Sequence, residues 1–228
     1  MPAIPKHGKV GAFYAARGII RANTIAFAIS PSRITDSANG LVTARFLENM
    51  KVTVAGSVSN NTTYTVGAGG VAAGTLTLTS APTPENAGPL VTVYEAGPGG
   101  APYGFMNWSL DWTAEPAEVT NFQSGGAREF IAGIYQWKAT GERNFSLEDA
   151  AWTTNIWMGG VVNTWQWVRL FTQYAAIPTT TPGQAIYYEG LALVTATNVN
   201  FPHDEVVTQK YDIQGVGALT PVIKTTAW

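Results

Sequence analysis

The sequence of 228 residues predicts a mainly β fold with one packed helix and a small inserted β module. Apolar residues alternate with threonine or other polar residues in many short segments, which is typical of strands with one buried face. Clusters of glycine, asparagine and proline separate these segments and supply turns. Apolar residues recur at three- and four-residue steps over 146–158, where we expect the helix.

The composition is poor in charge. Charged residues make up 12% of the chain, about half of the ~25% usual in globular proteins, while the hydrophobic fraction of 46% is ordinary. A β-rich chain of this kind predicts a surface largely covered by other subunits, although an extracellular β protein with a neutral polar surface would have the same composition. The net charge of −2 argues against tight binding of a phosphate backbone. The absence of cysteine excludes disulfides, thiolate catalysis and thiolate metal sites.

Residues 1–23 combine prolines, spaced basic residues and a strand-like segment over 10–20. The four cations are spread over the segment, so we expect them to be solvated or paired with acidic residues; an arm that binds polyanions would carry denser charge. They are Lys6, Lys9, Arg17 and Arg21. The first residues have too short an apolar run for a signal peptide, and no window reaches the ~20 apolar residues of a membrane helix, so we expect neither.

Residues 24–97 carry their own set of short strands and end in a Gly-Pro-rich linker. Two strands are expected over 24–35, then a turn at 37–40 and a possible short helix over 41–49. Four further strands each place a pair of apolar residues on one face. These pairs are Val52/Val54, Tyr64/Val66, Leu76/Leu78 and Val91/Val93. We therefore interpret 24–97 as a module inserted between the first strand and the rest of the chain.

The segment 107–145 contains the most distinctive pattern, NWSLDWTAEPAEVTNFQSGGAREF followed by IAGIYQWKATGERNF. Trp108, Leu110 and Trp112 alternate with polar residues, which predicts a strand. A glycine-rich connector then places Arg128 beside Glu129, and a further strand rich in Tyr, Trp and Thr follows.

This segment resembles the core of the tail tube (major tail) proteins of long-tailed bacteriophages. The resemblance implies a tail-tube-type β-sandwich or barrel made by 1–23 and 98–228, with the one helix packed on the sheet and the inserted module on the tube exterior. It implies a structural virion protein without catalysis, synthesised in the host cytoplasm, whose hexameric rings stack into a tube. Further implied partners are the tape measure, tail terminator and tip proteins, and DNA that passes through the lumen without tight binding.

The same resemblance implies which residues contact neighbouring subunits. They are Phe122, Arg128, Glu129 and Phe130. The sequence departs from the family at 125–127, where Gly-Gly-Ala stands in place of the large aromatic residue that many members have before the arginine. The packing of this loop is therefore left open.

The inserted module resembles a small β module that recurs in phage structural proteins, through its Ile-x-Phe start and the segments VAGSVSNNTTYTV and TLTLT. On the outside of a tube it would be a decoration that contacts a host surface. It would equally serve as extra packing between neighbouring subunits.

The last part of the chain predicts the helix and three long strands. Ser146 is placed to cap the helix, and the acidic residues after it favour the positive end of the helix dipole. The strands are expected over 161–173, 184–201 and 205–217. Arg169 and Glu189 would pair across the first two, as an exposed ion pair of small energetic value.

Enzymatic and metal sites are not predicted, and neither is a cofactor. His203 with its two acidic neighbours falls short of a convergent set of metal ligands. No glycine cluster has the context of a phosphate-binding loop, and no serine lies in a nucleophile elbow. The eight tryptophans leave one alternative open, a carbohydrate- or surface-binding β module of a tail or cell-surface protein. We favour burial or subunit packing because Trp108/Trp112 and Trp165/Trp167 recur on single strand faces.

Overall fold

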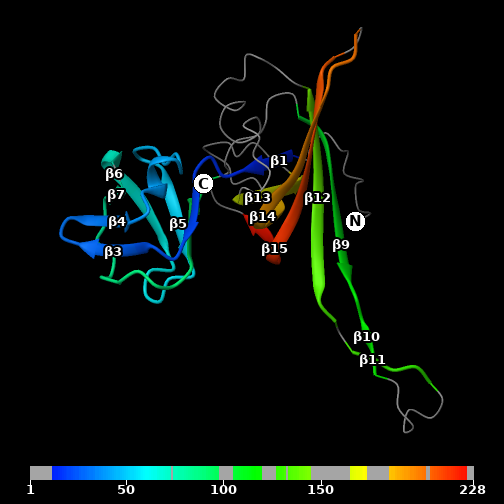
Figure 1. The fold of residues 1–228 in the computed structure, drawn as a ribbon, viewed down its shortest axis with the longest axis horizontal. Helices are drawn as coiled ribbons and strands as arrows, with labels where there is room; N and C mark the ends of the chain where they lie inside the picture. The colour runs from blue at the N-terminus through cyan, green and yellow to red at the C-terminus, as the bar shows by residue number, and fades with distance from the viewer. Residues whose placement is uncertain are drawn as a thin grey trace, which may run out of the picture.

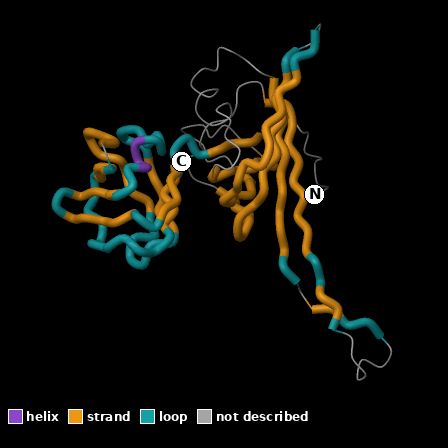
Figure 2. The backbone as a smooth tube through the Cα atoms, in the orientation of Figure 1, coloured by secondary structure: helices purple, strands orange, loops and turns teal. Residues whose placement is uncertain are grey.

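The computed structural model describes residues 12–72, 74–97, 105–119, 127–131, 133–144, 165–173, 185–203 and 206–224. In this part of the chain nearly all regular structure is strand (Figure 2). The strands form two extended antiparallel sheets, which lie side by side in Figure 1. The prediction of a mainly β protein is confirmed. The helix predicted over 146–158 lies outside the described residues, as does Phe122.

The first sheet, here called the core sheet, has six strands in the order β1-β13-β14-β15-β12-β9 and is open. Its strands are β1 Ala12–Ala15, β9 Phe105–Ala114, β12 Tyr135–Asn144, β13 Trp165–Gln173, β14 Ala185–Asn200 and β15 Thr208–Lys224. The sequence predicted the last strand to stop at residue 217. It continues instead to Lys224, because β15 pairs with β14 over its full length, with a register shift between Glu189 and Leu191.

The centre of the core sheet is filled by Trp137, which is 1% exposed. Its ring lies against the backbone of Gly215, where an added Cβ would stand 2.0 Å from the indole, and its Nε1 donates a hydrogen bond of 3.2 Å to the carbonyl of Gly217. Buried residues from several strands surround it: Ala15, Ala139, Val168, Leu170, Ala192, Val194, Tyr211, Ile213 and Leu219. Glycines in β14 and β15 leave a flat backbone surface, and the Trp137 ring packs on it.

The second sheet, here called the module sheet, has seven short strands in the order β2-β8-β5-β6-β7-β4-β3. They are β2 Ile19–Ala22, β3 Ile25–Ile29, β4 Ser32–Asp36, β5 Lys51–Ala55, β6 Thr63–Ala72, β7 Thr75–Leu78 and β8 Val91–Glu95. All eight residues of the predicted apolar pairs are buried in one cluster. The predicted strand faces are therefore confirmed, since period-2 alternation buries one side of each strand.

Two local predictions in this region are wrong. The segment 10–20 was expected to be one strand, but β1 joins the core sheet and β2 joins the module sheet. The short helix expected over 41–49 is reduced to a single 3-10 turn, Gly40–Val42. Arg45 and Asn49 adopt left-handed conformations, with φ of 62° and 64°, which interrupt a helix. The division into a core domain and a 24–97 insertion remains a prediction, with β2 now placed among the module strands.

Two hairpins extend from opposite ends of the core sheet (Figure 1). At one end β9 and β12 continue into a two-stranded extension formed by β10 Ala117–Glu118 and β11 Phe130–Ile131. At the other end β14 and β15 stay paired out to Asn200 and Thr208. Within the described residues, no helix is both long and apolar enough to cross a membrane.

Candidate assembly surfaces

The hairpin of β9 and β12, together with β10 and β11, is here called the long hairpin. Its two strands pair from Phe105 with Arg143 to Ala114 with Tyr135. Beyond the sheet, the Glu115 N–H donates to the Ile134 carbonyl at 3.2 Å, and the Val119 N–H donates to the Glu129 carbonyl at 2.9 Å. A two-stranded ribbon that projects from a domain is marginal in water by itself. A partner that covers the long hairpin would therefore stabilise it.

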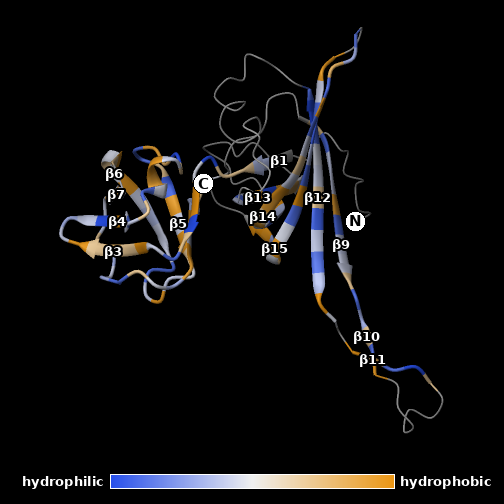
Figure 3. Ribbon diagram, in the orientation of Figure 1, coloured by the Kyte–Doolittle hydropathy of each residue, from blue (hydrophilic) through white to orange (hydrophobic). Residues whose placement is uncertain are grey.

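The long hairpin exposes an unusual number of large apolar side chains, and its apolar stretches are visible in Figure 3. Ile134 is 86% exposed and Phe130 is 56% exposed. The others are Met106, Trp112, Val119, Ile131 and Tyr135. The hairpin of β14 and β15, at the other end of the core sheet, exposes Phe201, which is 70% exposed, together with Val199 and Val206. Large apolar side chains that gather on one exposed element mark interaction sites more often than scattered ones do.

Three of the four predicted contact residues lie on the long hairpin. Phe130 pairs with Glu118 in the β10–β11 ladder, and Arg128 and Glu129 lie just before it. The Arg128 Nη1 is 4.0 Å from the Glu118 Oε2, and the two side chains are 77% and 45% exposed. An ion pair this long and exposed adds little stability to the hairpin. The conformation of these residues leaves them accessible to a neighbouring molecule.

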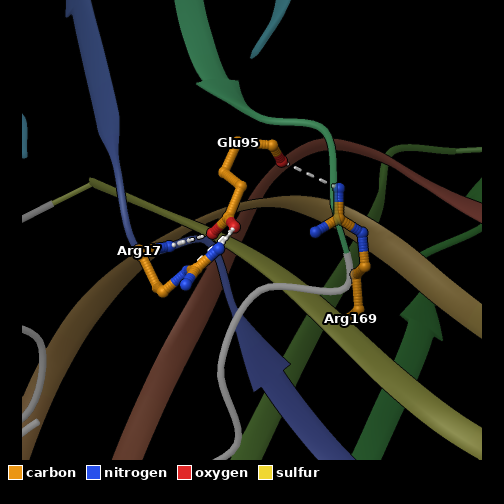
Figure 4. Close-up of polar contacts among 3 residues, drawn as sticks. All are labelled: Arg17, Glu95 and Arg169. Atoms are coloured by element: carbon orange, nitrogen blue, oxygen red, sulfur yellow. Dashed lines mark hydrogen bonds and ion pairs between the residues drawn. The ribbon is translucent and has the colours of Figure 1, made fainter. Parts of the chain in front are cut away.

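The junction between the two sheets contains a charged cluster that the sequence pattern did not reveal. The Arg17 guanidinium and backbone N–H both donate to the carboxylate of Glu95, and Arg169 donates to the Glu95 main-chain carbonyl at 3.2 Å (Figure 4). The Glu95 side chain is 2% exposed. The hydrogen bond and the charge of Glu95 raise the pKa of Arg17 despite partial burial, which opposes the rise. The sequence indicated only that Arg17, like the other cations of 1–23, is solvated or paired with an acidic residue.

The predicted pairing of Arg169 with Glu189 is confirmed, but its predicted exposure is wrong. The two residues are register partners, with 3.1 Å between the Arg169 Nε and the Glu189 Oε2. Arg169 is 2% exposed because the module sheet covers this side of β13. The Trp167 Nε1 also donates to Glu189, at 3.2 Å.

Tryptophans on β13 face the module sheet. Trp167 stacks on Tyr94, and the guanidinium of Arg21 lies 4.6 Å from the ring centroid of Trp165. Burial, followed by the charge of Glu189, raises the pKa of Tyr94 to about 12; the same causes raise that of Tyr187 to about 12. The junction is thus built of aromatic rings and paired charges.

Of the residues weighed as a metal site, the structure describes His203 alone. Among the described residues, no three His, Asp or Glu side chains lie close enough together to hold a metal ion. His203 lies in the exposed turn between β14 and β15, and its acidic neighbours fall outside the described residues.

Comparison with known proteins gives limited similarity. No protein-family model matches the chain, and no curated protein matches its sequence. The tail of an empty gene transfer agent particle, determined with helical refinement and C6 symmetry, aligns with a TM-score of 0.41 and 17% identity over 55% of this chain and 87% of that one. The virion of a native gene transfer agent particle aligns with a TM-score of 0.40 and 17% identity over 54% of this chain and 88% of that one. Similarity at these TM-scores does not establish a shared function.

Proposed function

We propose that the protein is a structural virion protein, a subunit of stacked hexameric rings that form the tail tube of a long-tailed phage or a related tail-like particle. Its role is assembly without catalysis, and DNA passes through the lumen without tight binding. Other copies of the chain are its main partners, with the tape measure, terminator and tip proteins at the ends of the tube.

One observation carries the proposal. The long hairpin projects from the core sheet with seven large apolar side chains exposed, and the residues that resemble the tail-tube motif, Arg128 to Phe130, lie on it. The part of the chain that the structure describes leaves these side chains exposed, and a neighbouring subunit is the partner that would cover them.

The open core sheet fits the same role. Among its described strands β1 and β9 are outermost, and β9 is ten residues long. Long edge strands invite pairing with another chain, and joining the sheets of six subunits in a closed ring would remove these edges. The weakly acidic chain suits a channel that DNA crosses without sticking.

Negative-stain electron microscopy of the concentrated protein tests the proposal. We expect rings or hollow tubes of uniform width. Phe130→Ser should abolish them, whereas Ile29→Ser, at a similarly exposed position of the module sheet, should not; the two side chains are 56% and 54% exposed. Polymers from Phe130→Ser that match those of the parent would contradict the role of the long hairpin.

A second candidate, glycan or surface binding, has one observation in its favour. Trp112 and Tyr135 are both about half exposed on the long hairpin, with ring centroids 6.4 Å apart. Aromatic faces of this kind can stack on a ligand. Saturable binding to an oligosaccharide array that is lost in Trp112→Ala, in a preparation without polymers, would favour this candidate.

A further inference from the structure

The chain passes between the two sheets at two places, and these places are tied to each other. The first crossing is Ala16 to Gly18, between β1 and β2, and the second begins at Glu95, the last residue of β8. The Glu95 N–H donates to the Gly18 carbonyl at 2.9 Å. The backbone N–H and the Nε of Arg17 donate to the two oxygens of the Glu95 carboxylate, both at 2.8 Å. One buried carboxylate therefore joins both crossings.

The same residue is tied to the core sheet. The Arg169 Nη2 donates to the Glu95 carbonyl, and the Arg169 Nε donates to Glu189. The Ala16 N–H donates to the Trp167 carbonyl at 2.8 Å. The cluster thus sets two cations, Arg17 and Arg169, against two anions, Glu95 and Glu189, and its formal charge is balanced.

Each sheet has its own apolar core. The buried cluster of the module sheet is formed by residues between Ile25 and Val93, and that of the core sheet is formed by Ala15 and residues from Trp137 onward. The two clusters share no residue. Among the described residues, the contacts across the junction include the charged cluster, the Tyr94–Trp167 stack and the Arg21–Trp165 contact. Loss of a junction contact therefore removes no apolar residue from either core.

We propose that Glu95 is a lock that holds the module sheet in one orientation on the core sheet, and that removal of its charge releases the module sheet as a folded, tethered body. Removal of the charge weakens the contacts that Arg17 makes with this carboxylate, which are strong because both partners are ionised; the Arg17 side chain is 49% exposed and that of Glu95 is 2% exposed. The junction then opens more easily, because water can satisfy the freed donors of Arg17 and both apolar cores stay intact. The lock does not depend on the proposed tail function.

Double electron–electron resonance on the full chain tests the lock. The chain has no cysteine, so two introduced cysteines carry spin labels at defined positions. Ser80, in the bend that follows β7, and Gln136 on β12 of the core sheet are exposed and suit this purpose. We expect one narrow distance distribution in the parent and a distribution at least about twofold wider in Glu95→Gln, with the circular dichroism of the folded β protein retained.

Glu85→Gln is the matched control. Glu85 also accepts several hydrogen bonds. They come from Ser57, Asn60 and the backbone between them, all within the part of the chain that forms the module sheet. This variant should keep the narrow distribution. A narrow distribution in folded Glu95→Gln would overturn the lock, and so would loss of both folded sheets in that variant.

Arg17→Gln gives a second, milder test. It removes the guanidinium contacts with the Glu95 carboxylate but keeps the backbone N–H of residue 17 and the Arg169 bond to the Glu95 main-chain carbonyl, so we expect a width between those of the parent and Glu95→Gln. A width equal to that of the parent would show that Arg17 plays no part in holding the module sheet.

Discussion

Tyr94 of the module sheet and Trp167 of the core sheet stack with their ring centroids 3.9 Å apart and their planes inclined by 14°. The two residues lie 73 positions apart in the chain (167 − 94) and belong to sheets with separate apolar cores. Their ring contact is therefore a second probe of the junction, linked to the charged cluster through the hydrogen bond from the Trp167 Nε1 to Glu189.

A double-mutant cycle should detect this contact. We expect Tyr94→Leu and Trp167→Leu to be non-additive in the free energy of unfolding, with a coupling of about 0.5–1.5 kcal/mol, because an aromatic pair adds that much beyond burial. Urea denaturation measures it. The control cycle combines Tyr94→Leu with Trp112→Leu, since Trp112 is half exposed on the long hairpin. The two changes in unfolding free energy should be additive within about 0.5 kcal/mol. Equal coupling energies in both cycles would show that the ring stack is not the source of the non-additivity.

Alkaline pH should weaken the junction. The pKa of both Tyr94 and Tyr187 is raised to about 12 from a usual value of 10, first by burial and then by Glu189. The folded state holds these protons more tightly, so their contribution is complete below pH 10 and is lost between pH 10 and about 12. Tyr94→Phe cannot ionise at this position and should lose less stability over that interval. Identical pH profiles of thermal unfolding for parent and variant would contradict this assignment.

Acid should weaken the module sheet through Glu85. Burial raises the pKa of this carboxyl, but hydrogen bonds from Ser57, from the backbone of Val58 and Ser59, and from Asn60 together lower it below 4.5. A lowered pKa means that the stability is present above about pH 4.5 and is lost as the pH falls through the folded value. Glu85→Gln should be less stable than the parent at pH 7, with a smaller further loss on acidification. Parallel acid profiles would show that another group titrates.

Much of the module sheet could be predicted from the sequence because its information is local. Alternation at Val52/Val54 and Leu76/Leu78 fixes which face is buried, and that face is the one in the core. The split of 10–20 was beyond such reasoning. Its halves join different sheets through distant partners, residues 168–171 for β1 and 91–94 for β2, and no local period encodes that choice.

The candidate sites divide in the same way. Residues Arg128 to Phe130 were found through a motif, and the structure places them on an exposed hairpin. The Arg17–Glu95 pair was missed because 78 positions separate the two residues. Arg169 and Glu189 could be paired from neighbouring strands, but their burial depends on the module sheet, whose position a strand pattern does not give.

Trp137 packs directly on Gly215, so the addition of one methyl group at this position should destabilise the fold. A Cβ at Gly215 would stand 2.0 Å from the indole Cε2, and at Gly190 it would stand 2.9 Å from the indole Cζ2. Overpacking of a filled core costs about 1–3 kcal/mol or more, so Gly215→Ala should lose about 3 kcal/mol and Gly190→Ala less. In Gly67→Ala the nearest atoms lie at 3.3 Å, and we expect a change of under about 1 kcal/mol. If denaturant unfolding showed a larger loss of stability in Gly67→Ala than in Gly215→Ala, this account of the packing would be contradicted.

Charge reversal on the long hairpin can separate a contact within the subunit from a contact between subunits. Arg128→Glu should change the free energy of unfolding by under about 1 kcal/mol, because the Arg128–Glu118 pair is long and exposed. If Arg128 faces a neighbouring subunit, as we propose, this variant should reduce sedimentable polymer at least about tenfold. Lys51→Glu makes the same change in net charge on the exposed surface of the module sheet and should assemble normally.

The double variant Glu118→Arg/Arg128→Glu then decides between the two roles. It restores an opposite-charge pair within the hairpin but still presents the wrong sign to a neighbour at position 128. Recovery of assembly by the double variant would mean that Arg128 acts only by supporting its own hairpin. Continued failure, with both variants folded, would show that the charge of Arg128 is needed across a subunit boundary, because the internal pair has been restored and assembly has not.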